Sequence, residues 1–144
     1  MPAATTTLAM CLIIAAQTYS VPPGVLLGIM QVEGGRIGQE VRNTNGSYDM
    51  GPMQINTIWL PTLSAKWGID QSTAKRWVRD DGCTNMAVAA WILRNRINLT
   101  GNLWSGIAGY HSLTPGLGSR YAAKVAAVMR RYRLSDRMDQ IAVR

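Results

Sequence analysis

The chain has 144 residues, of which 47% are hydrophobic and 16% are charged, with 15 Lys and Arg against 8 Asp and Glu. The longest purely apolar run, residues 8–16, is too short to cross a bilayer, which needs ~20 residues, and one histidine with two cysteines excludes an ordinary Cys/His zinc site. We therefore expect one globular domain over residues 1–144, ending in a basic tail at 135–144, with no metal site.

Apolar periodicity and cap residues predict helices at the beginning of the chain. Residues 5–21 form the first predicted helix. Its apolar part could also be the apolar region of a secretory signal, but no Lys or Arg precedes Arg36, so the basic region of such a signal is missing. We therefore assign this segment to the mature fold. Residues 22–35 form the second, with proline at its start and Gly34-Gly35 as its stop. Glu33 therefore lies on the last turn of the second helix.

The middle of the chain contains the one segment with hairpin character, residues 42–51, because Asn45-Gly46 is a strong tight-turn signal. Residues 53–67 predict a helix interrupted near Pro61, and residues 71–81 a short helix begun by Asp70. Residues 83–101, from a Thr84 cap, are apolar nearly all round and predict a central buried helix.

Two more helices are predicted at 102–111 and 119–134, the latter with Tyr121, Val125, Val128 and Tyr132 at helical spacing opposite a basic face. The class is mainly α with, at most, a small β-ribbon.

The C-terminal end is basic, since residues 120–144 hold seven Lys and Arg against two Asp. Such a face attracts polyanions such as nucleic acid, anionic lipid or acidic cell-wall polymers, or it is simply a solvated helix face. No nucleic-acid-binding signature accompanies the charge, so we expect no nucleic acid partner. We expect the basic face to hold the protein on anionic surfaces and to be separate from the chemistry.

One acid stands apart from the other seven. Glu33 follows a largely apolar run at 26–32, and apolar packing disfavours a charged carboxyl, so its pKa should be raised. A carboxylic acid that keeps its proton near neutral pH can protonate the leaving oxygen of a glycosidic bond. The other interpretation is an exposed residue at a helix end. Asp49 is considered below. The remaining acids have local explanations as helix-start, turn, loop or tail residues: Glu40, Asp70, Asp80, Asp81, Asp136 and Asp139.

The chain contains two cysteines, Cys11 and Cys83. If oxidised, the pair closes a loop of about 72 residues and implies an oxidising compartment. The alternative is two buried free thiols, and the residues alone leave both interpretations open.

Four segments in order carry a resemblance: "YSVPPGVLLGIMQVEGG", "NTNGSYDMGPMQINTIWLPTL", "CTNMAVAAWILRNRI", and "AGYHS" with "RYAAKV". Together they resemble the specialised lytic transglycosylases of bacterial secretion, conjugation and pilus systems, over roughly residues 8–132. The resemblance implies a lysozyme-like fold and a monomeric, exported, periplasmic enzyme. It also implies cleavage of peptidoglycan glycan strands between N-acetylmuramic acid and N-acetylglucosamine.

The resemblance also implies roles for individual residues. Glu33 matches the catalytic glutamate, Gln54 would face the sugar, and the cysteine of "CTN" would pair with Cys11. The expected substrate-binding set is Gln54, Met53, Asn56, Tyr110, Tyr121 and His111. Three residues depart from the family pattern, with Gly34 in place of serine, Pro52 in place of leucine and His111 in place of asparagine.

Asp49 is the second carboxylate to consider. It stands on the expected turn, where it either bonds to backbone amides or faces Glu33 across a cleft and stabilises an oxocarbenium-like transition state. In the mechanism that the resemblance implies, Glu33 acts first as acid and then as base, giving a 1,6-anhydro ring. This mechanism requires no metal and no organic cofactor. The alternatives are a hydrolytic muramidase and a catalytically silent peptidoglycan-binding scaffold.

Overall fold

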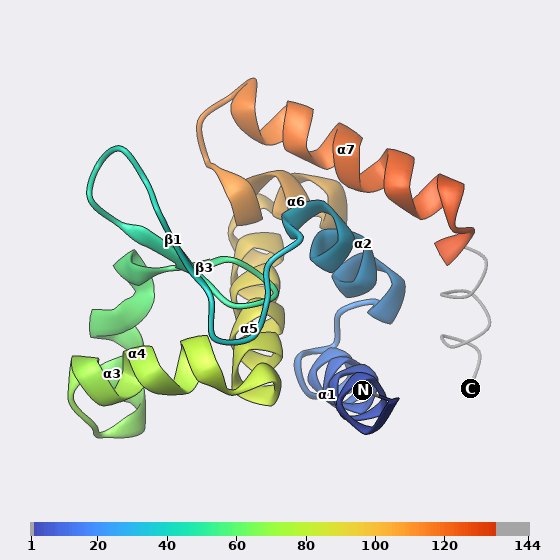
Figure 1. Cartoon of the computed structure of the whole chain (residues 1–144). Helices are drawn as coiled ribbons and strands as arrows, with labels where there is room; N and C mark the ends of the chain where they lie inside the picture. The colour runs from blue at the N-terminus through green and yellow to red at the C-terminus, as the bar shows by residue number, and fades with distance from the viewer. Residues whose placement is uncertain (1, 135–144) are drawn as a thin grey trace.

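A central helix, α5 (Gly82–Thr100), holds the structure together (Figure 1). The computed structural model describes residues 2–134, which form seven α-helices, a 3₁₀ helix and a small antiparallel sheet. Helix α5 packs against α1 (Pro2–Tyr19), α4 (Gln71–Asp80) and α6 (Leu103–His111) and touches the sheet. Most of its side chains between Asn85 and Leu93 are buried, which confirms the predicted central helix, and the seven helices confirm the mainly-α class. The basic tail at 135–144 lies outside the described residues.

The second predicted helix is α2 (Pro23–Glu33), and it ends at Glu33 as expected. Gly34 adopts a left-handed conformation with φ 65°, and its N–H donates to the Met30 carbonyl, which closes the last turn. Across α2 runs α7 (Leu117–Arg131), and the two pack closely because Gly28 has no side chain. A Cβ at Gly28 would lie 3.0 Å from Met129 Cγ.

The predicted hairpin is present and is extended by a third strand. Strands β1 (Glu40–Arg42), β2 (Tyr48–Met50) and β3 (Ile55–Asn56) pair antiparallel in that order, with Gly46 at φ +86° in the turn. In this register Asp49 lies opposite Val41 on one side and Asn56 on the other.

The helix predicted at 53–67 was wrong in its first half. The chain forms β3, then a 3₁₀ turn, η1 (Thr57–Trp59), and only then α3 (Leu60–Trp67). The Asn56 side chain accepts from the Ile58 N–H, which ends the strand and begins the turn. Pro61 lies in the first turn of α3, where a helix does not need its N–H, so it starts the helix instead of interrupting it.

Two finer expectations also need correction. The N-cap of α5 is Asp81 and not Thr84, because the Asp81 carboxylate accepts from the N–H of Cys83 at 3.0 Å. The carboxylate of Asp70 caps α4, as predicted.

On α7 the buried stripe is Tyr121, Val125 and Met129. Strict four-residue spacing keeps these three against α2, which leaves Val128 half-buried and Tyr132 48% exposed.

A disulfide joins Cys11 on α1 to Cys83 at the start of α5, so the free-thiol interpretation is wrong. The closed loop spans 72 residues, which stabilises the fold by about 4 kcal/mol in the chain-entropy model. No helix in the described part of the chain is long and apolar enough to span a membrane.

Asn85 on α5 is a fully buried polar side chain that joins three segments. Its Oδ1 accepts from the Met53 N–H at 2.8 Å, and its Nδ2 donates to the Met50 carbonyl at 2.9 Å and the Val78 carbonyl at 3.0 Å. The approach is close because Gly51, at φ +69°, has no Cβ; one would lie 2.3 Å from Asn85 Nδ2. The loop between β2 and β3 is thereby fixed to the central helix.

Replacing Asn85 by Ala should lower the free energy of unfolding by about 2–5 kcal/mol, because it leaves three buried backbone groups without partners. Asn85→Asp should cost at least as much, since a carboxylate cannot donate to the two carbonyls. Urea unfolding followed by circular dichroism measures both, with Asn95→Ala on the exposed side of α5 as the matched control. A loss below ~0.5 kcal/mol in both Asn85 variants would contradict this assignment.

Candidate active site

Glu33 lies at the C-terminal end of α2, where Gly34 turns the chain away and leaves the carboxyl at the edge of the core. Burial raises the pKa of Glu33 from its ordinary value of 4.5 to about 7, the nearby Tyr121 hydroxyl lowers it in part, and the Asp49 charge raises it further. This confirms the raised pKa expected from the apolar run before it. At neutral pH the carboxyl is thus protonated in about half of the molecules.

Three aromatic rings stand beside Glu33. Tyr121 from α7 is 5% exposed, Tyr110 from α6 lies parallel to it with ring centroids 6.4 Å apart, and His111 stacks on Tyr121 at 4.7 Å. The Tyr121 hydroxyl lies close enough to Glu33 to affect its pKa, yet no hydrogen bond of ordinary geometry joins them. Burial and the Glu33 charge raise the pKa of both tyrosines, so both hydroxyls remain protonated.

Asp49 lies on β2 and lines the same hollow as Glu33. Its carboxylate accepts from Asn56 Nδ2 at 3.0 Å, and Asn56 also donates to the Ser47 hydroxyl. The hydrogen bonds of the described residues thus join Asp49 to a side chain on the next strand and not to turn amides. Of the two sequence interpretations, the structure favours the carboxylate that faces the cleft.

The loop between β2 and β3 brings Gln54 to the site but keeps Met53 away from it. Gln54, at φ 53°, donates from Nε2 to the Gly51 carbonyl and lines the cleft. Met53 is 0% exposed, so its side chain belongs to the core, and its carbonyl accepts from the Tyr110 hydroxyl at 2.9 Å. The loop packs directly on Gly35, where a Cβ would lie 2.0 Å from the Gly51 carbonyl oxygen.

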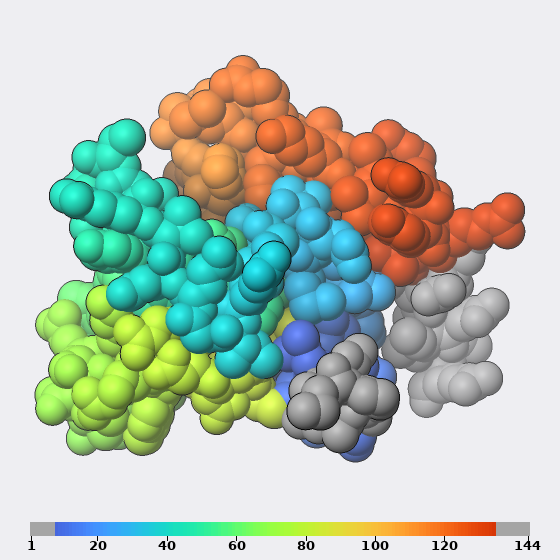
Figure 2. Space-filling model, in the orientation of Figure 1, coloured from blue at the N-terminus to red at the C-terminus, as the bar shows by residue number. Residues whose placement is uncertain are grey.

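Glu33 is shared by two adjoining hollows. The larger, about 470 Å³, runs between the hairpin and the end of α6 and includes Asp49, Gln54, Asn56, Tyr110 and His111. In Figure 2 the hairpin (cyan) and the α6–α7 region (orange) lie next to each other on this side of the molecule. The smaller, about 320 Å³, lies along α7 and also contains His111 and Tyr121. Glu33 and His111 belong to both linings, so the acid lies where the two hollows adjoin.

The basic face is separate from the site only in part. Arg120 and Lys124 line the smaller hollow together with Glu33, because they occupy the turn of α7 that carries Tyr121. Arg130 and Arg131, two turns further along α7, line neither hollow.

Trp59 and Arg96 are among the residues of the larger hollow that sequence reasoning did not predict. The Arg96 guanidinium lies over the Trp59 ring, 5.1 Å from its centroid. Arg96 is the second of two arginines that follow the apolar run of the central helix, and no sequence signal distinguished it from Arg94. Trp59 had no signal of its own either, because its segment was predicted to be helical.

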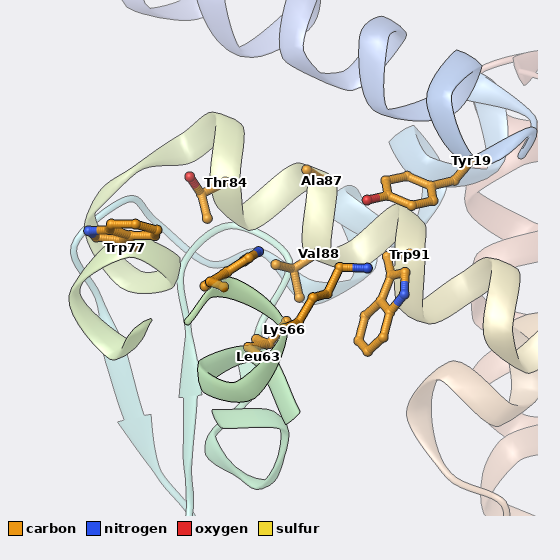
Figure 3. A pocket seen from close by; sticks show the side chains of 9 residues that line it. Tyr19, Leu63, Lys66, Trp77, Thr84, Ala87, Val88 and Trp91 are labelled. Atoms are coloured by element: carbon orange, nitrogen blue, oxygen red, sulfur yellow. The ribbon is translucent and has the colours of Figure 1, made fainter. Parts of the chain in front are cut away.

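A third hollow, about 250 Å³, lies between α3, α4, α5 and the end of α1 (Figure 3). Aromatic rings dominate its lining, and Lys66 and Thr84 supply polar groups. The residues that line it are Tyr19, Leu63, Lys66, Trp67, Trp77, Thr84, Ala87, Val88 and Trp91. No carboxyl belongs to this lining, so the hollow has no group for acid catalysis. The described residues also contain no group of three His, Cys, Asp or Glu that could hold a metal ion.

Comparison with known families identifies the class to which this site belongs. Residues 10–124 match the model of the Transglycosylase SLT domain. The chain belongs to this family. As an SLT-domain protein of mainly-α, lysozyme-like fold, it is a lytic transglycosylase at the family level, with peptidoglycan as its substrate class. The disulfide and the family together point to action outside the cytoplasm.

Similar proteins include the Invasion protein IagB of Salmonella typhimurium strain SL1344. The two are 30% identical over 123 residues, which covers 80% of this chain and 72% of IagB. The IagB of Salmonella typhi is likewise 30% identical over 123 residues. These similarities confirm the family resemblance seen in the sequence motifs.

Replacing Glu33 by Gln should stabilise the SLT domain above pH 7 and change little at pH 4. A carboxyl with a pKa of about 7 when folded and 4.5 when unfolded favours the folded state fully below pH 4.5, and this contribution is lost as pH rises to about 7. At about 1.4 kcal/mol per pKa unit, the loss reaches ~3 kcal/mol at most. Urea unfolding of both proteins at pH 4 and pH 8 measures it; an equal difference at the two pH values would contradict the raised pKa.

Proposed function

We propose that this SLT-domain protein cleaves the β-1,4 bond between N-acetylmuramic acid and N-acetylglucosamine, with formation of 1,6-anhydro-N-acetylmuramic acid. The observation that carries the proposal is Glu33, a carboxyl with a pKa of about 7 placed between two adjoining hollows. Such a carboxyl is present both as the acid that donates a proton and as the base that takes one back.

In the proposed reaction one residue serves twice. Glu33 protonates the glycosidic oxygen as the bond to C1 of the muramic acid breaks, and the N-acetylglucosamine end leaves as an alcohol. The carboxylate then removes the proton from the C6 hydroxyl, whose oxygen bonds to C1. The proton that Glu33 gave up is thereby returned, and no water enters the product. Asp49, across the cleft, would stabilise the positive charge that develops at C1.

The substrate contacts follow from the cleft lining. Gln54 and Asn56 present amide groups for the acetamido and hydroxyl groups of the sugars, and the exposed His111 ring offers a flat face between the two hollows. Tyr110 and Tyr121 would contribute mainly by excluding water from Glu33, since both are largely buried. Met53 would act through its backbone, which positions Tyr110. Gly34 in place of serine suits its left-handed conformation but removes one polar group from the site.

The cellular role that we propose is local opening of the cell wall for a secretion, conjugation or pilus apparatus, by a monomeric single domain in the periplasm. The similarity to a protein named for invasion supports this role. A hydrolytic muramidase is the second candidate, because Asp49 lines the cleft with Glu33 as a lysozyme-like carboxylate pair would. A silent peptidoglycan-binding scaffold is less well supported, since the acid is present with its pKa raised.

Glu33→Gln should reduce release of muropeptides from purified sacculi by at least ~10²-fold, because it keeps the shape of the side chain but removes the transferable proton. The matched control is Glu40→Gln, which changes the other glutamate of the chain, on β1, and should retain activity. Mass spectrometry of the products separates the two reactions, since hydrolysis gives a muropeptide one water heavier than the anhydro product. Near-normal turnover by Glu33→Gln would move the catalytic role elsewhere.

Asp49→Asn should shift the alkaline limb of the pH profile of kcat/KM to lower pH. The Asp49 charge raises the pKa of Glu33, so its removal makes Glu33 lose its proton at lower pH. The profile is measured with a soluble glycan, with Asp80→Asn, at the end of α4 and outside both hollows, as control. An unchanged limb with reduced kcat would show that Asp49 acts without affecting the Glu33 proton.

A further inference from the structure

Arg96 is a cation held in the wall of the cleft without an acidic partner. It lies on α5, is half-buried, and lines the larger hollow. Its Nε is buried and has no hydrogen-bond partner within residues 2–134. The ion pairs found there join Glu40 to Lys75 and Arg79, and Asp80 to Arg79, so no carboxylate pairs with Arg96 in the described structure.

Arg96 lines the part of the larger hollow that Trp59 also lines, with its guanidinium carbon 5.1 Å from the centroid of the Trp59 ring. A partly buried guanidinium without an acceptor is unfavourable, so the position calls for a partner that the protein itself does not provide.

The packing around Arg96 restricts its side chain in advance of binding. The guanidinium lies over the Trp59 ring, and α6 approaches the stem of the side chain at Gly109, where a Cβ would lie 3.5 Å from Arg96 Cδ. An arginine held in this way loses little side-chain entropy when its fork of N–H groups meets a planar oxygen pair. The matching ligand is a carboxylate.

The substrate class contains carboxylates at one kind of position only. Both sugars of the glycan have neutral hydroxyl and acetamido groups, whereas muramic acid carries a lactyl ether at O3 that ends in a carboxyl group. That group is free in a peptide-free glycan and is amidated where a stem peptide is attached, in which case the acids of the peptide take its place.

We propose that Arg96 forms a carboxylate-binding subsite that recognises the acidic O3 substituent of an N-acetylmuramic acid residue. This inference rests on the proposed function and adds to it a residue that determines how the glycan strand is positioned along the cleft. The two sugars alternate along the strand, so fixing a muramic acid at Arg96 fixes which of the two kinds of glycosidic bond lies at Glu33. Arg96 thereby selects muramic acid without taking part in the proton transfers.

Binding to the full chain carrying Glu33→Gln tests the subsite without turnover. Three glycans of equal length serve as probes: a peptide-free muroglycan with free lactyl carboxylates, a muroglycan with stem peptides, and a neutral chitooligosaccharide. Adding Arg96→Ala should weaken calorimetric binding of at least one muroglycan by ~10–100-fold, the range of a charge-assisted bidentate contact, and change chitooligosaccharide binding by less than ~2-fold. The muroglycan that is weakened identifies the lactyl or the peptide carboxylate as the ligand.

Two further variants separate binding from structure. Arg96→Gln fills the same space over Trp59 without charge and should show the same selective loss, and Arg130→Ala, exposed on α7 outside both hollows, should show none. Equal weakening of all three probes, or unchanged binding of both muroglycans, would overturn the subsite. If the Glu33→Gln protein binds none of the probes, the proposed function itself fails, which is a distinct result.

Discussion

The buried amide of Asn85 is the interaction on which the geometry of the site depends. It holds the loop between β2 and β3 against α5, and that loop in turn packs on Gly35 and accepts the Tyr110 hydroxyl through the Met53 carbonyl. Tyr110 then lies against Tyr121, which covers Glu33. Because a single amide satisfies three backbone groups at once, the loop has little freedom to shift, and the dry surroundings of Glu33 follow from its position.

These surroundings are unfavourable for stability and useful for chemistry. A carboxyl with its pKa raised by burial weakens the fold above neutral pH, and the nearby Asp49 charge adds to the effect. The disulfide between α1 and α5 and the tightly packed α5 core offset the loss elsewhere. Cations flank the acid without neutralising it, with Arg96 along one hollow and Arg120 and Lys124 along the other, so an anionic glycan can be attracted while Glu33 keeps its proton.

The sequence predicted the helices and the candidate acid because both depend on local signals. Apolar spacing, the Gly34 stop and the isolated charge of Glu33 are all readable within one helix. The family motifs added Tyr110 and the site role of Tyr121, which helical spacing had marked only as an apolar position of the last helix. The third strand, the burial of Met53 and the Arg96–Trp59 pair depend on contacts between distant segments, so spacing alone could not reveal them. The same applies to the basic face, whose overlap with the site follows from the packing of α7 on α2.

The central claim is that the folded protein holds the Glu33 carboxyl protonated near neutral pH. Titration of the side-chain carboxyl carbons by NMR, in protein labelled with ¹³C-glutamate, measures this directly, because Glu33 and Glu40 are the two glutamates of the chain. The account predicts one resonance with a midpoint at a pH of about 7, assigned to Glu33 by its absence from the Glu33→Gln spectrum. A Glu33 midpoint near 4.5 in the folded protein would contradict it.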